Sequence, residues 1–181
     1  MGRLAIDVSA IIGEPGASLP FDADVPLERV AVGDTVLTFL EPPRAALTIS
    51  NTGVGLVAVG AVTGRATLEC SRCLEPFTHV IEGSVESGYL PTGTEMPEEP
   101  DEEWETFEGE TVDLLPAIEA ALVVEVPFAP VHDEECLGIC PTCGCDLNRE
   151  QCECEPVDPA GSENPFAALK DLVHEEHADD S

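Results

Sequence analysis

The chain has 181 residues and a formal net charge of −30, because seven Lys and Arg stand against 37 Asp and Glu. Nucleic-acid affinity depends on cations that displace counterions from phosphates, and the seven cations here are scattered. The charge therefore argues against a bare phosphate backbone or an anionic membrane as partner, and favours a basic protein. With 43% hydrophobic residues the chain is too apolar to be disordered throughout, and its length suits one domain or one domain with an appendage.

Residues 1–90 predict a β-rich domain, because short runs of β-branched and apolar residues alternate with Pro and Gly breaks. The expected strands are 4–8, 27–32, 35–40 and 45–49, then 57–62 with 65–68 as one long strand bent near Gly60 or Gly64, and finally 77–89. The last two form a hairpin whose turn holds Cys70 and Cys73. This half shows no constellation of catalytic residues.

Two stretches bear on location. The segment 4–12 is interrupted by Asp7 and Ser9, so it lacks the apolar core of a signal peptide. The uncharged stretch 45–64 has the length of a membrane span, but four glycines and several polar residues interrupt it, which suits strand, turn, strand. We therefore expect a cytoplasmic protein without a membrane segment. In a reducing cytoplasm, closely spaced thiols are more often metal ligands or redox centres than disulfides.

The composition changes at residues 91–111, which we expect to be an acidic linker or loop. Nine acids and no base fall between residues 95 and 110, with Trp104 and Phe107 as candidate anchors onto the domain or a partner. Residues 112–160 should form a helix, capped by Asp113 and ended by Pro127, followed by a cysteine-rich segment packed on the first part. Residues 161–181 should form a terminal helix and tail. The fold class expected is α+β.

The tail carries the strongest chemical signal. Cys140-Pro-Thr-Cys143-Gly has the spacing of a zinc knuckle, in which two residues between the cysteines place both sulfurs on one tetrahedral ion. Zinc needs four ligands, and Cys152 and Cys154 lie close enough along the chain to supply the other two. An iron–sulfur cluster, disulfides or free thiols are the competing interpretations.

A second knuckle-like pair, Cys70 and Cys73, lacks two partners, and His132 and Cys136 can supply them. One or two zinc ions are then expected, and only Cys145 is left over. Spacing does not fix this partition: Cys145 could replace Cys152 or Cys154, and Cys136 could complete the tail site. The Cys70/Cys73 pair could instead be a thiol-redox centre or two inert buried thiols. A site with four protein ligands stabilises a fold and leaves no open position for catalysis.

The cysteine motifs also resemble the YceD family, which is implicated in the accumulation of large-subunit ribosomal RNA. The resemblance covers roughly residues 65–172 and rests on three segments in family order, which are 68–77 around Cys70-Ser-Arg-Cys73, 127–148 from Pro127 through Cys136 to Leu147-Asn148, and Asn164-Pro-Phe-Ala-Ala-Leu169-Lys. His132 stands where many members carry a cysteine, Ile139 replaces the usual leucine, and Cys145 is an extra thiol. The resemblance implies a non-enzymatic role in large-subunit biogenesis.

These observations together predict a zinc-binding assembly factor that binds a basic ribosomal protein or the precursor large subunit. The charge supports a protein contact, because a basic ribosomal protein not yet bound to RNA is attracted to a polyanion. Direct RNA binding through the two knuckles, with Arg72 and Arg149 as contacts, is the alternative, although the charge disfavours it. A thiol oxidoreductase centred on Cys70 and Cys73 is the third hypothesis.

Overall fold

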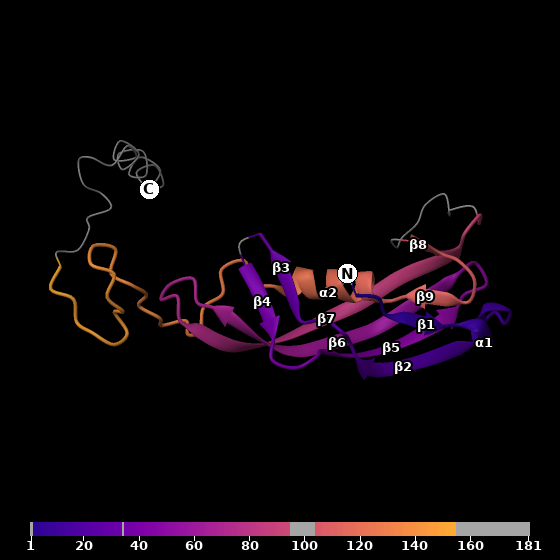
Figure 1. Cartoon of the computed structure of the whole chain (residues 1–181), viewed down its shortest axis with the longest axis horizontal. Helices are drawn as coiled ribbons and strands as arrows, with labels where there is room; N and C mark the ends of the chain where they lie inside the picture. Colours follow the sequence, from indigo (N-terminus) through magenta and orange to yellow (C-terminus); the bar gives the residue numbers. More distant parts are fainter. Residues whose placement is uncertain (1, 34, 95–103, 155–181) are drawn as a thin grey trace, which may run out of the picture. The chain divides into compact units, whose positions relative to one another are not determined.

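The computed structural model describes residues 2–33, 35–94 and 104–154 (Figure 1). The chain divides into two compact units, residues 1–134 and residues 135–181. The first unit contains the sheet and both helices of the described residues, and the second contains the cysteine-rich tail. The predicted terminal helix lies outside the described residues.

A seven-stranded, mostly antiparallel sheet dominates the first unit. Five strands follow the order β2 (Ser18–Asp24), β5 (Arg44–Asn51), β6 (Leu56–Glu69), β4 (Thr35–Phe39) and β3 (Arg29–Val32). Strand β6 is long enough to pair with β5 along its first part and with β4 near its end, and it also pairs along its whole length with β7 (Pro76–Pro91). Strand β7 in turn pairs in parallel with β8 (Trp104–Phe107). A separate pair joins β1 (Ala5–Asp7) to β9 (Thr111–Asp113), and the helices are α1 (Ser9–Ile12) and α2 (Leu115–Glu125). The β-rich α+β class is therefore confirmed.

The predicted hairpin is confirmed and is the longest feature of the sheet. Its register runs without interruption from Leu56 opposite Tyr89 to Glu69 opposite Pro76, through both Gly60 and Gly64. Burial alternates along β7 from Pro76 to Ser87, so that one face packs into the core while the other is exposed, and the residues from Ser87 to Leu90 are all buried. The turn 70–75 that closes this hairpin carries Cys70 and Cys73.

Helix α2 covers the buried face of β7. Leu115, Ile118 and Leu122 form its buried side. A Cβ on Gly83 of β7 would lie 2.7 Å from the carbonyl oxygen of Ala121, so the helix backbone approaches the strand too closely for any side chain there. The predicted helix is thus present, and the Asp113 carboxylate accepts the first helical N–H from Leu115 at 3.1 Å.

Strands β2, β8 and β9 and the short helix α1 were not predicted. Strand β2 contains Pro20 in mid-strand, which an edge strand tolerates because one side of it needs no ladder hydrogen bond. Strand β8 lies in the acidic segment, where the Trp104 ring packs so close to Gly88 that a Cβ there would lie 2.7 Å from it. Phe107 is buried. In the described ranges neither helix is long and apolar enough to cross a membrane.

Candidate metal centres

The turn between β6 and β7 brings Cys70 and Cys73 together. The Leu74 N–H donates to the Cys70 carbonyl at 2.9 Å, and the Cys70 N–H donates to the Glu75 carbonyl at 3.0 Å. Leu74 has φ 64°, a left-handed conformation that non-glycine residues rarely adopt. This tight turn leaves both cysteine side chains buried at the end of the hairpin.

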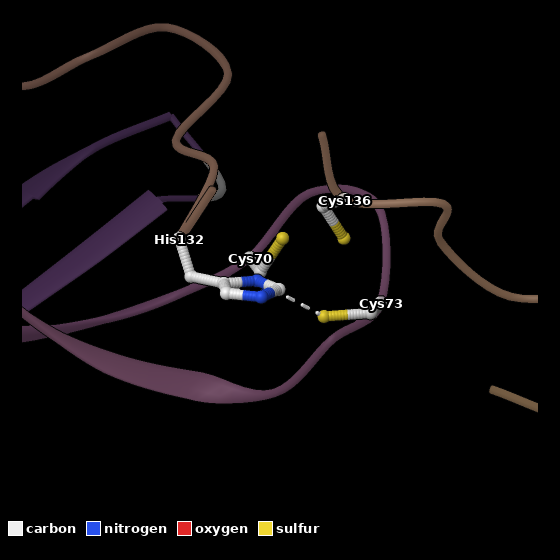
Figure 2. A group of neighbouring side chains, drawn as sticks. All are labelled: Cys70, Cys73, His132 and Cys136. Atoms are coloured by element: carbon white, nitrogen blue, oxygen red, sulfur yellow. Dashed lines mark hydrogen bonds between the residues drawn. The ribbon is translucent and has the colours of Figure 1, made fainter. Parts of the chain in front are cut away.

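A segment that follows α2 lies against this turn and supplies the histidine. The Ser71 N–H donates to the Pro130 carbonyl at 2.7 Å, and the Arg72 guanidinium donates to the Glu134 carbonyl at 2.9 Å. These two bonds fix the segment on either side of His132, whose Nδ1 lies 3.4 Å from the Cys73 sulfur. The ligand atoms of Cys70, Cys73 and His132 all lie within 4.8 Å of one another, and Figure 2 draws these side chains with Cys136.

The surroundings of Cys70 favour its thiolate. Burial raises the pKa of this thiol, but backbone N–H groups of Cys73 and His132, the His132 side chain and the Arg72 N–H outweigh burial and lower it to about 5. The lowered pKa favours the thiolate form of Cys70 at neutral pH. The thiolate is the form of cysteine that binds a metal ion.

In the second unit a small hairpin carries three more cysteines. Its ladder consists of an isolated bridge between Ile139 and Asp146 and a hydrogen bond from the Leu147 N–H to the Gly138 carbonyl at 2.9 Å. At the tip, the Cys140 N–H donates to the Cys145 carbonyl at 2.8 Å. The chain returns at Cys152, and the sulfurs of Cys140, Cys143, Cys145 and Cys152 all lie within 4.8 Å of one another.

Three separations within the two groups are close to those around a tetrahedral zinc ion. Zinc–sulfur bonds of about 2.3 Å and zinc–nitrogen bonds of about 2.0 Å place two sulfurs about 3.8 Å apart, and a sulfur and a nitrogen about 3.5 Å apart. The Cys152 sulfur lies 3.5 Å from that of Cys143 and 3.4 Å from that of Cys140, and the Cys73–His132 separation is 3.4 Å. Both groups could therefore hold a metal ion.

The thiols of the tail share negative charge unequally. The N–H groups of Cys143 and Thr142 and the Cys152 side chain lower the pKa of Cys140 to about 6. The Cys143 side chain raises the pKa of Cys145 to about 12, and the Cys152 side chain does the same to Cys154. Four sulfurs crowded this closely are therefore not all ionised without a cation among them, which is the situation that a divalent metal relieves.

The compact group of the tail contains Cys145 in the place for which the sequence first suggested Cys154. The sequence had left this choice open. Cys154 stays adjacent, with its N–H donating to the Cys152 sulfur at 3.3 Å. Arg72 contacts the Glu134 carbonyl, and Arg149 pairs with Asp146 at 3.3 Å.

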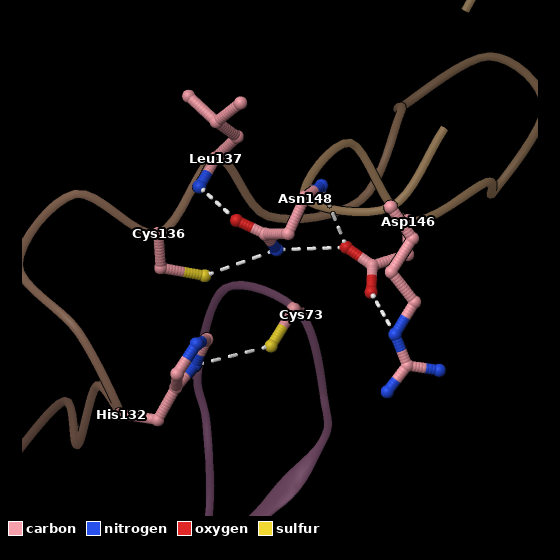
Figure 3. A network of polar contacts seen from close by, with 7 residues as sticks. Cys73, His132, Cys136, Leu137, Asp146 and Asn148 are labelled. Carbon is pink, nitrogen blue, oxygen red and sulfur yellow. Dashed lines mark hydrogen bonds and ion pairs between the residues drawn. The ribbon is translucent and has the colours of Figure 1, made fainter. Parts of the chain in front are cut away.

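The sequence analysis assigned no role to Asn148 of the second unit. In the structure, its side chain donates a hydrogen bond to the Cys136 sulfur (Figure 3). The only signal available for it was its place in the Leu-Asn part of the family pattern.

The fold and the two groups define a β-rich protein with cysteine clusters of the metal-ligand type. Residues 58–173 match the family described as large ribosomal RNA subunit accumulation protein YceD, so the chain belongs to the YceD family. The resemblance seen in the sequence is thereby confirmed.

Relatives of this chain occur in distant bacteria. A protein of Haemophilus influenzae named large ribosomal RNA subunit accumulation protein YceD is 29% identical over 152 residues, which cover 81% of each chain. An uncharacterized protein of Mycobacterium tuberculosis is 28% identical, covering 81% of this chain and 72% of its own length. One from Mycobacterium leprae is 27% identical, covering 94% and 77% respectively. No solved structure matches the chain.

Proposed function

We propose that this protein is a cytoplasmic, non-enzymatic, zinc-stabilised factor for the accumulation of large-subunit ribosomal RNA, and that it binds a basic ribosomal protein or the precursor subunit. The observation that carries the proposal is the occurrence of two compact groups of sulfur and imidazole ligands in a chain of the YceD family. The name of the Haemophilus influenzae relative supplies the ribosomal RNA role.

The first zinc site consists of Cys70, Cys73, His132 and Cys136. Only three residues separate Cys136 from His132, and a step of four positions along an extended chain spans at most about 14 Å, so the chain keeps this cysteine within reach of the turn. Three thiolates and one imidazole make a closed tetrahedral set. Zinc there ties the segment after α2 to the end of the β6–β7 hairpin.

The second site takes Cys140, Cys143 and Cys152, with either Cys145 or Cys154 as the fourth ligand. Structural zinc contributes directly to folding, because the unfolded chain has no preformed site. The tail hairpin has one isolated bridge, and its Leu137 and Ile139 side chains are exposed, so most of its stability should come from the metal. All ligand positions are then filled by protein, which supports a structural rather than a catalytic role.

The exposed face of the sheet is the surface that best suits a basic partner. On strands β2, β5, β6 and β7 every second residue points away from the core, and we call this set the open face. Its charged members are five acids and two bases, namely Asp22, Asp24, Glu69, Glu82, Glu86, Arg44 and Arg65. Arg44 is already paired with Asp22 at 2.8 Å. The open face therefore attracts cations, and complementary charge mainly speeds the encounter.

The two arginines that could have favoured RNA binding already have partners within the protein. Arg72 donates to a backbone carbonyl, and Arg149 pairs with Asp146. Phosphate binding would have to compete with these contacts and with the surrounding acids. These contacts support a protein rather than an RNA as the partner.

Metal analysis tests the zinc sites. Elemental analysis of the untagged protein should find two zinc ions, falling to one in Cys70→Ser and to one in Cys140→Ser. The cysteines of both groups should resist alkylation until a chelator is added. A protein without zinc whose Cys70 alkylates at once would contradict the proposal and favour the thiol-redox alternative.

Binding kinetics test the partner. The association rate with purified basic proteins of the large ribosomal subunit should fall as salt rises, and should fall again in the double variant Glu82→Lys/Glu86→Lys. Glu125→Lys, which reverses an exposed acid at the end of α2, is the matched control and should have the smaller effect. Affinity that does not change with salt would contradict a charge-driven contact. Filter binding of precursor ribosomal RNA that is lost in Arg72→Glu would favour the RNA alternative.

A further inference from the structure

The side chain of Asn148 holds Cys136 from two directions. Its Nδ2 donates to the Cys136 sulfur at 3.5 Å, and its Oδ1 accepts the backbone N–H of Leu137 at 2.8 Å (Figure 3). One planar amide thus contacts both the thiol and the peptide group that follows it. Cys136 lies outside the tail hairpin, so these contacts connect it to residues that the hairpin carries.

Asn148 is itself held by Asp146. The carboxylate oxygen Oδ1 of Asp146 accepts from the Asn148 side chain at 2.7 Å and from its backbone N–H at 2.9 Å, while Oδ2 pairs with Arg149 at 3.3 Å. This carboxylate accepts hydrogen bonds and has none to donate, so Nδ2 of Asn148 must face it and Oδ1 must face Leu137. The network therefore determines which end of the amide points to the Cys136 sulfur.

Asp146 is fixed in turn by the hairpin that holds the tail cysteines. It forms the bridge with Ile139, and its neighbour Cys145 accepts the N–H of Cys140. An unbroken series of contacts therefore runs from the cysteine group at the hairpin tip, through Asp146 and Asn148, to the sulfur of Cys136. Every contact in the series lies within the second unit.

We infer that Asn148 is a positioning residue that presents the Cys136 sulfur to the first zinc site and makes this presentation depend on metal in the tail hairpin. The inference rests on the proposed function, because it requires Cys136 to be a ligand. Hydrogen bonds to a metal ligand orient it, and their loss typically lowers metal affinity by about 10- to 100-fold. Metal that orders the hairpin fixes Asn148, so binding at the two sites is coupled.

The test measures zinc binding to the full chain by competition with a chelator. Two binding steps are expected, and the step that Cys70→Ser abolishes identifies the first site. Asn148→Ala should weaken that step by about 10- to 100-fold, and it should change the hairpin step by a smaller factor, because only the loss of coupling acts there. Asn148→Asp, which keeps the acceptor for Leu137 but places a carboxylate against Asp146, should weaken it at least as much. Glu150→Ala, an exposed neighbour, should change neither step.

A second measurement isolates the coupling. Cys140→Ser should also weaken the first-site step, and combining it with Asn148→Ala should add little, because both substitutions release the same sulfur. Cobalt(II) bound to Asn148→Ala should show a weaker thiolate-to-metal absorption band at the first site, which a general loss of stability would not produce. Fluorescence of Trp104, the only tryptophan, reports whether the first unit stays folded.

The outcomes separate the inference from the proposed function. Wild-type protein that binds no zinc overturns the proposed function. Wild-type protein with two sites, of which Asn148→Ala changes neither or weakens only the hairpin site, overturns the role of Asn148 alone. Fully additive effects of Cys140→Ser and Asn148→Ala overturn the coupling.

Discussion

Leu74 and Gly144 occupy the same position in two turns of the same construction. Each follows the second cysteine of a Cys-x-x-Cys pair, each has a positive φ, 64° for Leu74 and 75° for Gly144, and each donates its N–H at 2.9 Å to the carbonyl of the first cysteine. N–H groups two and three residues after the first cysteine lower the pKa of that cysteine in both turns. The chain thus builds the same ligand-bearing turn twice, once at the end of a sheet hairpin and once in the tail.

Leu74→Gly should stabilise the first unit. A left-handed conformation costs a non-glycine residue about 1–2 kcal/mol, and glycine removes this cost. Glycine also has more freedom in the unfolded chain, which lowers the stability gained by about 0.5–1 kcal/mol. The free energy of unfolding should therefore rise by up to about 1 kcal/mol. Leu74→Val, with a β-branched side chain in the same turn, should lower it. Urea denaturation monitored by Trp104 fluorescence measures the free energy of unfolding of both variants. A higher free energy of unfolding for Leu74→Val than for Leu74→Gly would contradict this account of the turn.

Gly144→Ala should destabilise the tail turn by about 1 kcal/mol. A Cβ at this position meets no atom within 4 Å, so the cost arises from backbone conformation and not from a clash. The measurement is the zinc affinity of the hairpin step, which should fall while the first-site step changes less. An Ala variant with unchanged affinity would show that the turn does not need a left-handed residue.

Cys145→Ser and Cys154→Ser determine the fourth ligand of the tail site. The Cys145 sulfur lies within the compact group, so Cys145→Ser should lower the affinity of the hairpin step more than Cys154→Ser does. Cys154 lies beside Cys152 and can move in as a replacement, so Cys145→Ser should still bind metal. Only the double variant should lose the site. Loss of the site in Cys154→Ser alone would assign that cysteine as the ligand.

Arg72→Ala should weaken the first zinc site without any RNA present. Its guanidinium fixes the backbone of the segment that carries His132, so its removal should lower zinc affinity by about 10-fold. Arg65→Ala removes an exposed arginine of the open face and is the matched control. Equal zinc affinity in Arg72→Ala and wild type would contradict the role of Arg72 in fixing the segment that carries His132.

Gly83→Ala should destabilise the first unit by about 1–3 kcal/mol, because the new Cβ would lie 2.7 Å from the Ala121 carbonyl and force α2 away from β7. Gly13→Ala is the matched control, since a Cβ there meets no atom within 4 Å. Thermal unfolding monitored by circular dichroism compares the two variants. Equal melting temperatures would contradict the close packing of helix on strand.

Features that arise from neighbouring residues could be predicted from the sequence alone. Alternation of apolar and polar residues specified the β6–β7 hairpin, because a strand that buries one face leaves little freedom in register. Two residues between paired cysteines specified both ligand turns in the same way. The helix after the acidic segment followed from its apolar spacing and from Pro116 in its first turn.

Features that depend on distant neighbours were not predictable from the sequence. Strand β8 lies in a segment whose charge suggests solvent, and it forms because β7 offers it an edge and because Gly88 leaves room for the Trp104 ring. Counting ligands in the sequence named His132 as a candidate partner of Cys70 and Cys73. The contacts that bring it to the Cys73 sulfur, which are bonds from Ser71 and Arg72 to the carbonyls of Pro130 and Glu134, are visible only in the tertiary structure.

The choice among the tail thiols and the role of Asn148 were likewise decided by tertiary structure. Spacing permits several sets of four cysteines, and the hairpin ladder is what places Cys145 with Cys140, Cys143 and Cys152. Asn148 carries no chemistry that marks it in a sequence, since a neutral amide matters only through the groups around it. Cys136 and Asp146, twelve and two residues away, give that amide its orientation and its function.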